Sequence, residues 1–274
     1  QMQPKLRERL VEHIDFKEEE LERWHDIVAK LAVVMDEDGI ISQFDGYRGL
    51  KEIDWDYYRE KHGNVRRMDR ILKAENDSPD YYQVSKQADV LMLWYVLSPQ
   101  EVADVLGKMG YSLEDPYALI KRNYDYYLPR TSHGSTLSYI VHGAIMTYMS
   151  GHEEEEWRWF MESLKSDIYD TQGGTTLEGI HSGVMAAALS IIVDEFAGVA
   201  VEPNTLYLEP DLPESWDHIG FIMRFRSAFF TISANRDYVR VSCDGSCPQP
   251  VEVHLDGSVH SLEAGQHVEA RLSR

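Results

Sequence analysis

The chain has 274 residues, and 47 acidic residues against 27 basic ones give a formal net charge of −20. Hydrophobic residues make up 43% and charged residues 27%, which excludes disorder throughout and allows one large or two modest domains. So acidic a surface repels phosphate backbones and anionic lipid, so we expect neither nucleic acid nor a membrane as a partner. No apolar run approaches the roughly 18 residues that a bilayer span needs.

The two cysteines, Cys243 and Cys247, are too few for a disulfide scaffold. They could pair across a turn, but we expect reduced thiols in a cytoplasmic protein. Residues 1–5 lack the apolar core of a signal peptide. Nothing in the sequence points to a metal ion or an organic cofactor.

The first two hundred residues have the periodicity of helices joined by long loops. Asp15 and Glu18 resemble a capping box, and apolar residues then recur at helical spacing up to Leu31. Residues 37–82 break this regularity with many glycines and aromatic residues, which predicts a long loop. A loop of that length is more often part of a binding site than a plain connector.

Helical periodicity returns after this loop and continues to about residue 196. The predicted helices cover residues 84–97, 99–110, 116–127, 135–149, 152–166 and 181–196. Paired helices of similar length indicate an array of helical hairpins, either a solenoid or a closed helical barrel. The absence of a repeat at fixed period makes the solenoid the weaker choice.

The pattern changes to strands near Val201. Apolar and polar residues alternate around residues 206–208, 221–225, 239–243 and 251–255, and Asp256–Gly257 is a hairpin signal. We therefore predict a mainly α protein with a helical domain at residues 1–203 and a small antiparallel β-sheet domain at residues 204–274. Helices first and strands afterwards indicate two packed modules.

Three polar clusters lie at predicted helix starts: residues 85–89, 130–138 and 171–181. The free backbone N–H groups and the dipole of a helix N-terminus attract an anion, and glycine lets it approach closely. The hydroxyls, a lysine and two histidines of these clusters would complete a phosphate site. A P-loop is excluded because its glycine-rich motif is absent.

Simple helix capping is the alternative interpretation of each cluster, because serine and threonine are common at helix starts. The density of the third cluster argues for more. Its eleven positions contain three glycines, three threonines, a glutamine, a glutamate and a histidine, which exceeds what one cap requires.

Several segments together resemble glycoside hydrolase family 65, the family of kojibiose, maltose and trehalose phosphorylases, with the kojibiose branch the most similar. The resemblance lies in residues 85–93, 130–138 and 172–181, with further matches at residues 43–47 and 206–213. It spans nearly the whole chain in the expected order. It implies an (α/α)6 barrel followed by a small C-terminal β-sheet domain.

The resemblance also implies an activity: inverting phosphorolysis, in which an α-glucosyl disaccharide and inorganic phosphate give β-glucose 1-phosphate and a free sugar. It places Lys86 and Gln87 at the sugar and phosphate subsites. The expected phosphate contacts are Ser135, Thr136, Thr175, Thr176, His181 and, at the rim, His133.

The family's general acid is a glutamate in an Asp-Glu-Tyr segment that this sequence does not contain. Only about seven helices of useful length are predicted, fewer than a closed barrel of six helical pairs requires. We therefore expect half or more of the barrel, as a fragment, a proteolytic product or one product of a split gene. Such a chain would pair with an N-terminal half of the enzyme or self-associate through an exposed apolar interface.

Two other functions remain open. The family contains hydrolases, in which a carboxylate activates water, and Glu178 is the local candidate for that catalytic role. Ala187 stands where the family usually has glycine, and its methyl group would narrow the approach to the anion, which makes the phosphate preference less secure. Because the general acid is absent, a non-catalytic carbohydrate-binding protein is the third hypothesis.

Overall fold

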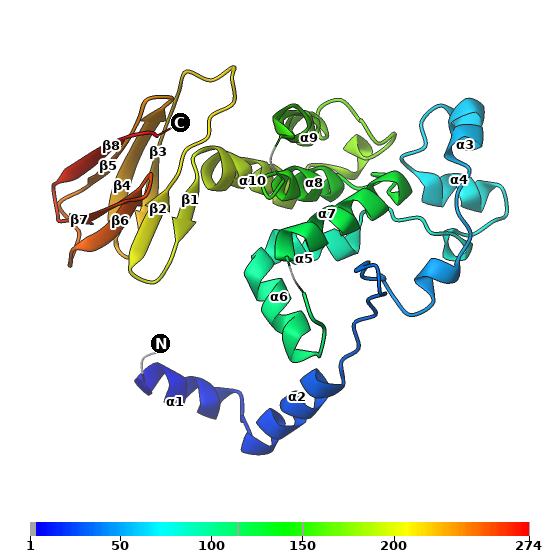
Figure 1. Cartoon of the computed structure of the whole chain (residues 1–274), viewed down its shortest axis with the longest axis horizontal. Helices are drawn as coiled ribbons and strands as arrows, with labels where there is room; N and C mark the ends of the chain where they lie inside the picture. The colour runs from blue at the N-terminus through cyan, green and yellow to red at the C-terminus, as the bar shows by residue number, and fades with distance from the viewer. Residues whose placement is uncertain (1–3, 114, 150, 274) are drawn as a thin grey trace.

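Helices form the first part of the chain and strands the last part (Figure 1). The computed structural model describes residues 4–113, 115–149 and 151–273. This arrangement confirms the mainly α prediction and the C-terminal β region. The helices are α1 (Pro4–His13), α2 (Glu18–Lys30), α3 (Trp55–His62), α4 (Met68–Ala74), α5 (Met92–Val96), α6 (Pro99–Lys108), α7 (Pro116–Tyr127), α8 (Leu137–Met146), α9 (Glu153–Lys165) and α10 (Ser182–Ser190).

The long loop predicted for residues 37–82 is wrong in part, because α3 and α4 lie within it. Asp54 caps α3 by accepting a hydrogen bond from the Tyr57 backbone N–H at 3.0 Å. Tyr58, Met68 and Leu72 are buried against each other in a small separate core. The two helices are too short for their periodicity to stand out from the surrounding turns, and packing between them makes up for weak local preference.

The helix predicted for residues 84–97 is also wrong over its first half. Only α5 and a 3₁₀ turn at Asp89–Leu91 are helical. Ser85 instead runs parallel to Thr131, and the Ser85 N–H donates to the carbonyl of Arg130 at 2.9 Å. The Ser132 N–H donates back to the Ser85 carbonyl at 2.8 Å. These bonds use the backbone groups that a helix would have paired internally.

The other predicted helices are confirmed, the one at residues 116–127 with the same bounds and the others with small changes at their ends. The capping box of α2 is formed by Lys17 and Glu20 rather than by Asp15 and Glu18, since the Lys17 N–H donates to Glu20 at 3.0 Å. Asp15 has a φ of 51° and belongs to the preceding turn. The helix predicted for residues 181–196 consists of α10 and a π-helical segment, Ile191–Phe196, that follows it directly.

The helical core lies around α7 and α8, where Ile120, Tyr127 and Ile140 are fully buried. Aromatic side chains join this region to the β domain. Trp157 and Phe160 of α9 contact Trp216, which precedes the β domain's third strand, at centroid distances of 6.1 and 6.3 Å. The two regions therefore share a packed apolar boundary.

The C-terminal region contains two four-stranded sheets, in the orders β1-β2-β6-β7 and β3-β4-β5-β8. Strand β2 pairs with β6 in parallel, so the prediction of a purely antiparallel domain is wrong for this pair. In the second sheet Ile232 lies opposite Val241, and both are fully buried. The strands are β1 (Val199–Val201), β2 (Thr205–Leu208), β3 (His218–Phe225), β4 (Ala228–Asn235), β5 (Tyr238–Cys243), β6 (Val251–Leu255), β7 (Ser258–Leu262) and β8 (His267–Arg271).

The N-terminal helices α1 and α2 extend away from the rest of the molecule (Figure 1). Helix α2 is strongly amphipathic, yet none of its residues is buried. Its apolar side chains Trp24 and Val28 are 49% and 69% exposed. The closed (α/α)6 barrel stays a prediction.

Candidate active site

Residues 66–70, the segment at the start of α4, contact the second and third polar clusters and lie near Lys86 of the first. The Arg66 guanidinium donates to the Thr171 carbonyl of the third cluster and pairs with Glu162 at 3.2 Å. Its carbonyl lies against Gly134 of the second cluster, where an added Cβ would come within 2.3 Å of that oxygen. Glycine at position 134 is therefore needed to let the two loops meet.

Lys86 of the first cluster is next to the same segment. An added Cβ at Gly134 would lie 3.2 Å from the Lys86 side chain, and the Gly134 N–H donates to the Lys86 carbonyl at 3.0 Å. Lys86 is exposed. Burial of Asp69 raises the pKa of its carboxyl, but the hydrogen bond and charge of Arg67, and to a lesser degree the charge of Lys86, lower that pKa overall. Gln87 donates to Asp89 at 3.2 Å.

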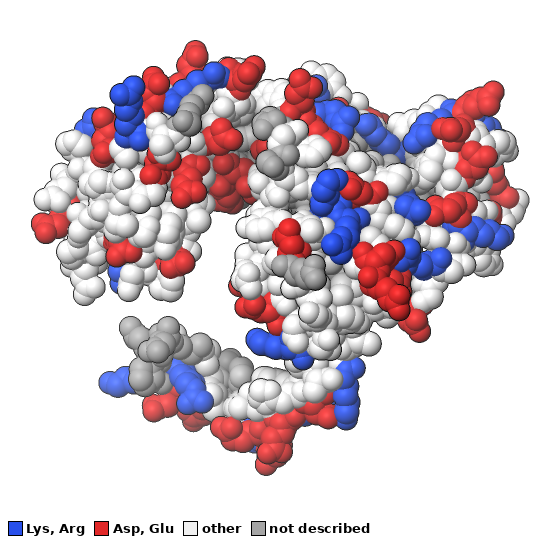
Figure 2. Space-filling view, in the orientation of Figure 1, with Lys and Arg blue, Asp and Glu red and all other residues white. Residues whose placement is uncertain are grey.

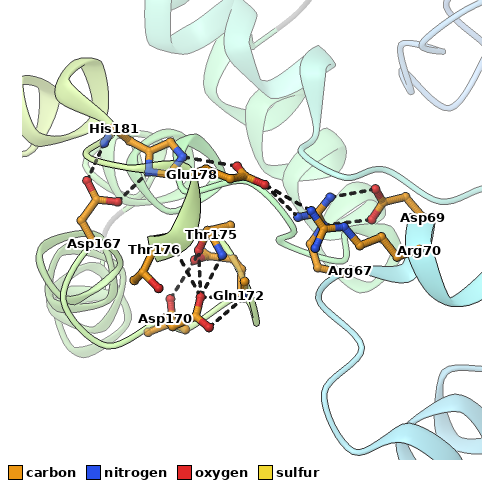
Figure 3. A network of polar contacts seen from close by, with 12 residues as sticks. Arg67, Asp69, Arg70, Asp167, Asp170, Gln172, Thr175, Thr176, Glu178 and His181 are labelled. Carbon is orange, nitrogen blue, oxygen red and sulfur yellow. Dashed lines mark hydrogen bonds and ion pairs between the residues drawn. The ribbon is translucent and has the colours of Figure 1, made fainter.

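His181 stands at the N-cap of α10 and is held from behind by Asp167 (Figure 3). Its ring Nδ1 donates to Asp167 at 2.6 Å, and its backbone N–H donates to the other oxygen of the same carboxylate at 2.7 Å. The Asp167 side chain is only 6% exposed. This pair fixes the imidazole and turns Nε2 toward Glu178.

Glu178 lies between His181 and two arginines of the α4 segment (Figure 3). Its Oε1 is 3.2 Å from Arg70 and 3.5 Å from Arg67, and its Oε2 is 3.7 Å from the His181 Nε2. Asp69 also pairs with Arg67, at 3.1 Å, and this hydrogen bond raises the pKa of Arg67. The site therefore gathers cationic groups that the net charge of the chain does not suggest.

The third cluster contains a second, internal anion contact. The Asp170 carboxylate accepts hydrogen bonds from the backbone N–H groups of Gly174 at 2.7 Å and Thr175 at 2.8 Å, with Thr176 farther away at 3.4 Å. The Thr175 hydroxyl is buried and donates to Gln172 at 3.0 Å. A phosphate could reach these amides only by displacing Asp170, so phosphate contacts from Thr175 and Thr176 stay a prediction.

The second cluster is far less accessible. His133 has ring neighbours His142 at 4.8 Å and Trp159 at 4.9 Å, and its Nδ1 contacts the Ser138 hydroxyl at 2.9 Å. Burial, and then the nearby His142, lower the pKa of His133 to about 2. The imidazole is therefore neutral and offers an anion no charge. Its predicted rim position is not supported by these contacts.

The two hydroxyl residues of the second cluster differ in exposure. Thr136 is buried just ahead of α8, whereas Ser135 is half-buried. A phosphate contact from either residue stays a prediction.

A cavity of about 850 Å³ lies elsewhere, between α9, the π-helical segment and the β domain. Its lining includes the carboxylates Glu156, Asp194, Glu195, Asp211 and Glu214. Burial raises the pKa of Glu195 to about 7. Acidic side chains gather in the hollow beside the β domain in Figure 2. Such a cavity repels phosphate, so we place the candidate site at His181 instead.

Sequence reasoning missed Asp167, Arg67 and Arg70. The run of arginines at residues 66–70 in so acidic a chain was the available signal. Among the described residues, no three His, Cys, Asp or Glu side chains are arranged to hold a metal ion. Both thiols are free. No helix in the described ranges combines the length and apolarity needed to cross a bilayer.

Comparison with known proteins gives two matches to family profiles. The glycosyl hydrolase family 65 central catalytic domain matches residues 2–190, and the C-terminal domain of the same family matches residues 200–262. A solved protein from the human microbiome, described provisionally as a kojibiose phosphorylase, superposes with a TM-score of 0.69 at 22% identity. The superposition covers 97% of this chain and 36% of the solved protein's chain, and it shows that the two share a fold.

Relatives of known sequence give the same result. Trehalose 6-phosphate phosphorylase of Lactococcus lactis is 42% identical over 77% of this chain, and kojibiose phosphorylase of Halothermothrix orenii is 33% identical over 86%. An uncharacterized glycosyl hydrolase of Mycobacterium tuberculosis is 38% identical over 98%. The chain spans only 27%, 28% and 20% of these three proteins, respectively. The chain belongs to glycosyl hydrolase family 65.

Proposed function

We propose that the chain is the C-terminal part of an inverting α-glucoside phosphorylase that forms β-glucose 1-phosphate. Two of its relatives are named phosphorylases, one for trehalose 6-phosphate and one for kojibiose. The observation that carries the proposal is the imidazole of His181, held by Asp167 and facing the same point as the Arg67 and Arg70 guanidinium groups. Arginine and imidazole donors at one point suit a phosphoryl group.

In this reaction an oxygen of phosphate forms a bond to C1 of the glucosyl unit. At the same time the bond from C1 to the leaving sugar's oxygen breaks, and a carboxylic acid gives its proton to that oxygen. Attack from the opposite face converts the α-linkage into a β-phosphate. Phosphate is already an anion, so it needs orientation rather than a general base. Lys86 and Gln87 would contact sugar and phosphate from the adjacent loop.

The same proposal assigns the general acid and the rest of the barrel wall to an N-terminal portion. Its support is the unpartnered apolar surface of the first two helices, whose exposed residues are Leu6, Leu10, Leu21, Trp24, Ile27 and Val28. A helix that is amphipathic but buries nothing is usually covered by another chain segment. The partner is therefore the N-terminal half of the enzyme or, failing that, a second copy.

The experiment is a product assay on the chain together with its N-terminal portion. Kojibiose, trehalose and trehalose 6-phosphate are each supplied with and without inorganic phosphate. We expect phosphate-dependent release of glucose 1-phosphate from one of them. Free glucose formed without phosphate would make the protein a hydrolase, with Glu178 as the candidate base. Sugar binding without turnover would make it a carbohydrate-binding protein.

A further inference from the structure

The Glu178 carboxylate is an incomplete partner for the groups around it. Arg67 and Arg70 both approach Oε1, at 3.5 and 3.2 Å, while His181 approaches Oε2 at 3.7 Å (Figure 3). Good charge-assisted hydrogen bonds measure about 2.7–2.9 Å. Two guanidinium groups, and the imidazole when both of its nitrogens carry a proton, thus converge on one carboxylate, and of the three contacts only that of Arg70 is within hydrogen-bonding distance. A tetrahedral phosphoryl group carries more oxygens and more charge.

Two of the three groups around Glu178 (Arg67 and His181) are held by other partners. The Arg67 side chain is only 13% exposed, and its Nε and Nη2 donate to the two Asp69 carboxylate oxygens at 3.2 and 3.1 Å. His181 is held by the two hydrogen bonds that it donates to the Asp167 carboxylate. These partners hold Arg67 and His181 in place whether or not Glu178 is present, whereas Arg70 is 54% exposed and pairs with Glu178 itself.

The segment that carries Glu178 is, in contrast, unpacked. Glu178 ends a 3₁₀ turn of three residues, Thr176–Glu178, and its side chain is 48% exposed. The flanking Leu177 is 91% exposed and Ile180 is 81% exposed. Gly179 follows with φ of 100°, a conformation that residues with a Cβ rarely adopt. The carboxylate can therefore swing away without disturbing the core.

We propose that the Glu178 carboxylate occupies the position of a phosphoryl group and must be displaced when that group binds to Arg67, Arg70 and His181. Glu178 is then an internal competitor rather than a general base. The inference rests on the proposed function for the location of the site. The phosphoryl group belongs either to inorganic phosphate or to a sugar phosphate, since the donors recognise the same dianion in both.

The test measures binding of inorganic phosphate, and separately of glucose 6-phosphate, to the protein by isothermal titration calorimetry. Wild type is compared with Glu178→Gln and with Glu75→Gln as the matched control. Glu75 is a carboxylate on α4's C-terminal side that is held by Lys61 at 2.7 Å and His62 at 2.8 Å, away from the three donors.

We expect Glu178→Gln to bind one of the two probes about 10-fold more tightly, as for a site that its own competitor leaves free about one time in ten. Glu75→Gln should leave the affinity unchanged, and Arg70→Gln should weaken it. The more tightly bound probe identifies the source of the phosphoryl group. Unchanged or weaker binding in Glu178→Gln would overturn the inference, as would equal tightening in Glu75→Gln or binding of neither probe by wild type and Glu178→Gln.

The proposed function fails separately. If turnover needs no phosphate while Glu178→Gln still tightens phosphoryl binding, the phosphorylase is refuted and the competitor stands. If turnover requires phosphate while Glu178→Gln leaves affinity unchanged, the phosphorylase stands and the competitor is refuted. Because Glu178 is half-exposed on an unpacked turn, its substitution should leave the melting temperature unchanged, which a thermal melt checks.

Discussion

Two loops of similar sequence character place their histidines in opposite surroundings. In the loop of residues 130–138, His133 lies beside the rings of His142 and Trp159, and burial keeps both imidazoles neutral. In the loop of residues 167–181, His181 lies between two carboxylates, with Asp167 at 2.6 Å and Glu178 at 3.7 Å. Both loops combine hydroxyls, glycine and histidine ahead of a helix.

The difference shows that such a composition identifies a place but not a role. A desolvated imidazole next to aromatic rings supplies shape and one hydrogen bond. An imidazole that donates to a carboxylate through one nitrogen presents the other nitrogen in a fixed orientation, and that nitrogen donates to an anion when it also carries a proton. The contacts of His133 in the first loop suit a structural role, and the second loop is the one in which we expect the histidine to act in chemistry.

The largest expected effect is a loss of activity on substitution of the histidine in the second loop. Replacing His181 with alanine removes a donor aimed at the phosphoryl group, so we expect kcat/KM for phosphorolysis to fall about 10²–10³-fold. The measurement is glucose 1-phosphate release by the protein with its N-terminal portion.

A surface histidine serves as the control for this substitution. His254 in β6 also contacts a carboxylate, Glu252 at 2.8 Å, but lies in the β domain. His254→Ala should retain wild-type activity. Equal loss in both variants, or full activity in His181→Ala, would break the contrast between the loops.

The second prediction tests the neutrality of the buried histidines through stability. Burial lowers the pKa of His142 from 6.5 to about 4. The unfolded chain therefore takes up a proton near pH 6.5 that the folded chain refuses, and stability falls as the pH falls from about 6.5 to about 4. The slope from this residue approaches 1.4 kcal/mol per pH unit, and the full loss is about 3 kcal/mol.

Urea unfolding between pH 7 and pH 4.5 measures this slope in wild type and His142→Asn. Asparagine keeps a donor for the Ser138 carbonyl, which His142 contacts at 2.7 Å, but does not titrate. Glu195, whose pKa burial raises to about 7, acts with the opposite sign: it stabilises at low pH and loses that contribution as the pH rises through 7. Its effect cancels in the difference between the two proteins. Parallel slopes would show that His142 is not held neutral.

The sequence predicted the helices that have a long apolar periodicity, such as α7 and α9, and the alternating strands. It did not predict α3 and α4, because each is stabilised by contacts with the other more than by its own pattern. It extended the helix before α5 over Ser85, because pairing between Ser85 and Thr131 joins positions that are remote in sequence. The periodicity of a short segment does not indicate which residues far away in the sequence it pairs with.

The candidate site shows the same division. Motif resemblance identified Lys86 and His181, and the structure links their loops through the α4 segment. Arg67 and Arg70 were missed because their partner Glu178 lies more than a hundred residues away, as the separation of 108 between Arg70 and Glu178 shows. Asp167 was missed because it stands at the end of a predicted helix, where a carboxylate looks like ordinary surface charge.

The third prediction sharpens the contrast by changing the partner of His181 instead of the histidine. In Asp167→Asn the single amide oxygen can accept only one of the two hydrogen bonds, and the negative charge is lost. We expect the KM for phosphate to rise about 10-fold, the loss of one charge-assisted hydrogen bond. The KM for the disaccharide should stay constant. A purely structural role would instead lower kcat and the melting temperature with no selective change in phosphate KM.

The smallest expected effect concerns the side chains within the third cluster. Thr175 is buried with its hydroxyl donating to Gln172 at 3.0 Å, whereas Thr176 is half-buried beside it. Thr175→Val removes one of the two hydroxyls that donate to the Gln172 oxygen, the other being that of Thr171 at 3.0 Å, so we expect the free energy of unfolding to fall by about 1 kcal/mol. Thr176→Val should change it by less than about 0.5 kcal/mol. Both variants keep the backbone N–H groups, so neither should raise the phosphate KM if the Thr175 hydroxyl serves the fold. A raised phosphate KM in Thr175→Val at unchanged stability would instead assign that hydroxyl to the anion, and the two loops would then differ less than their contacts indicate.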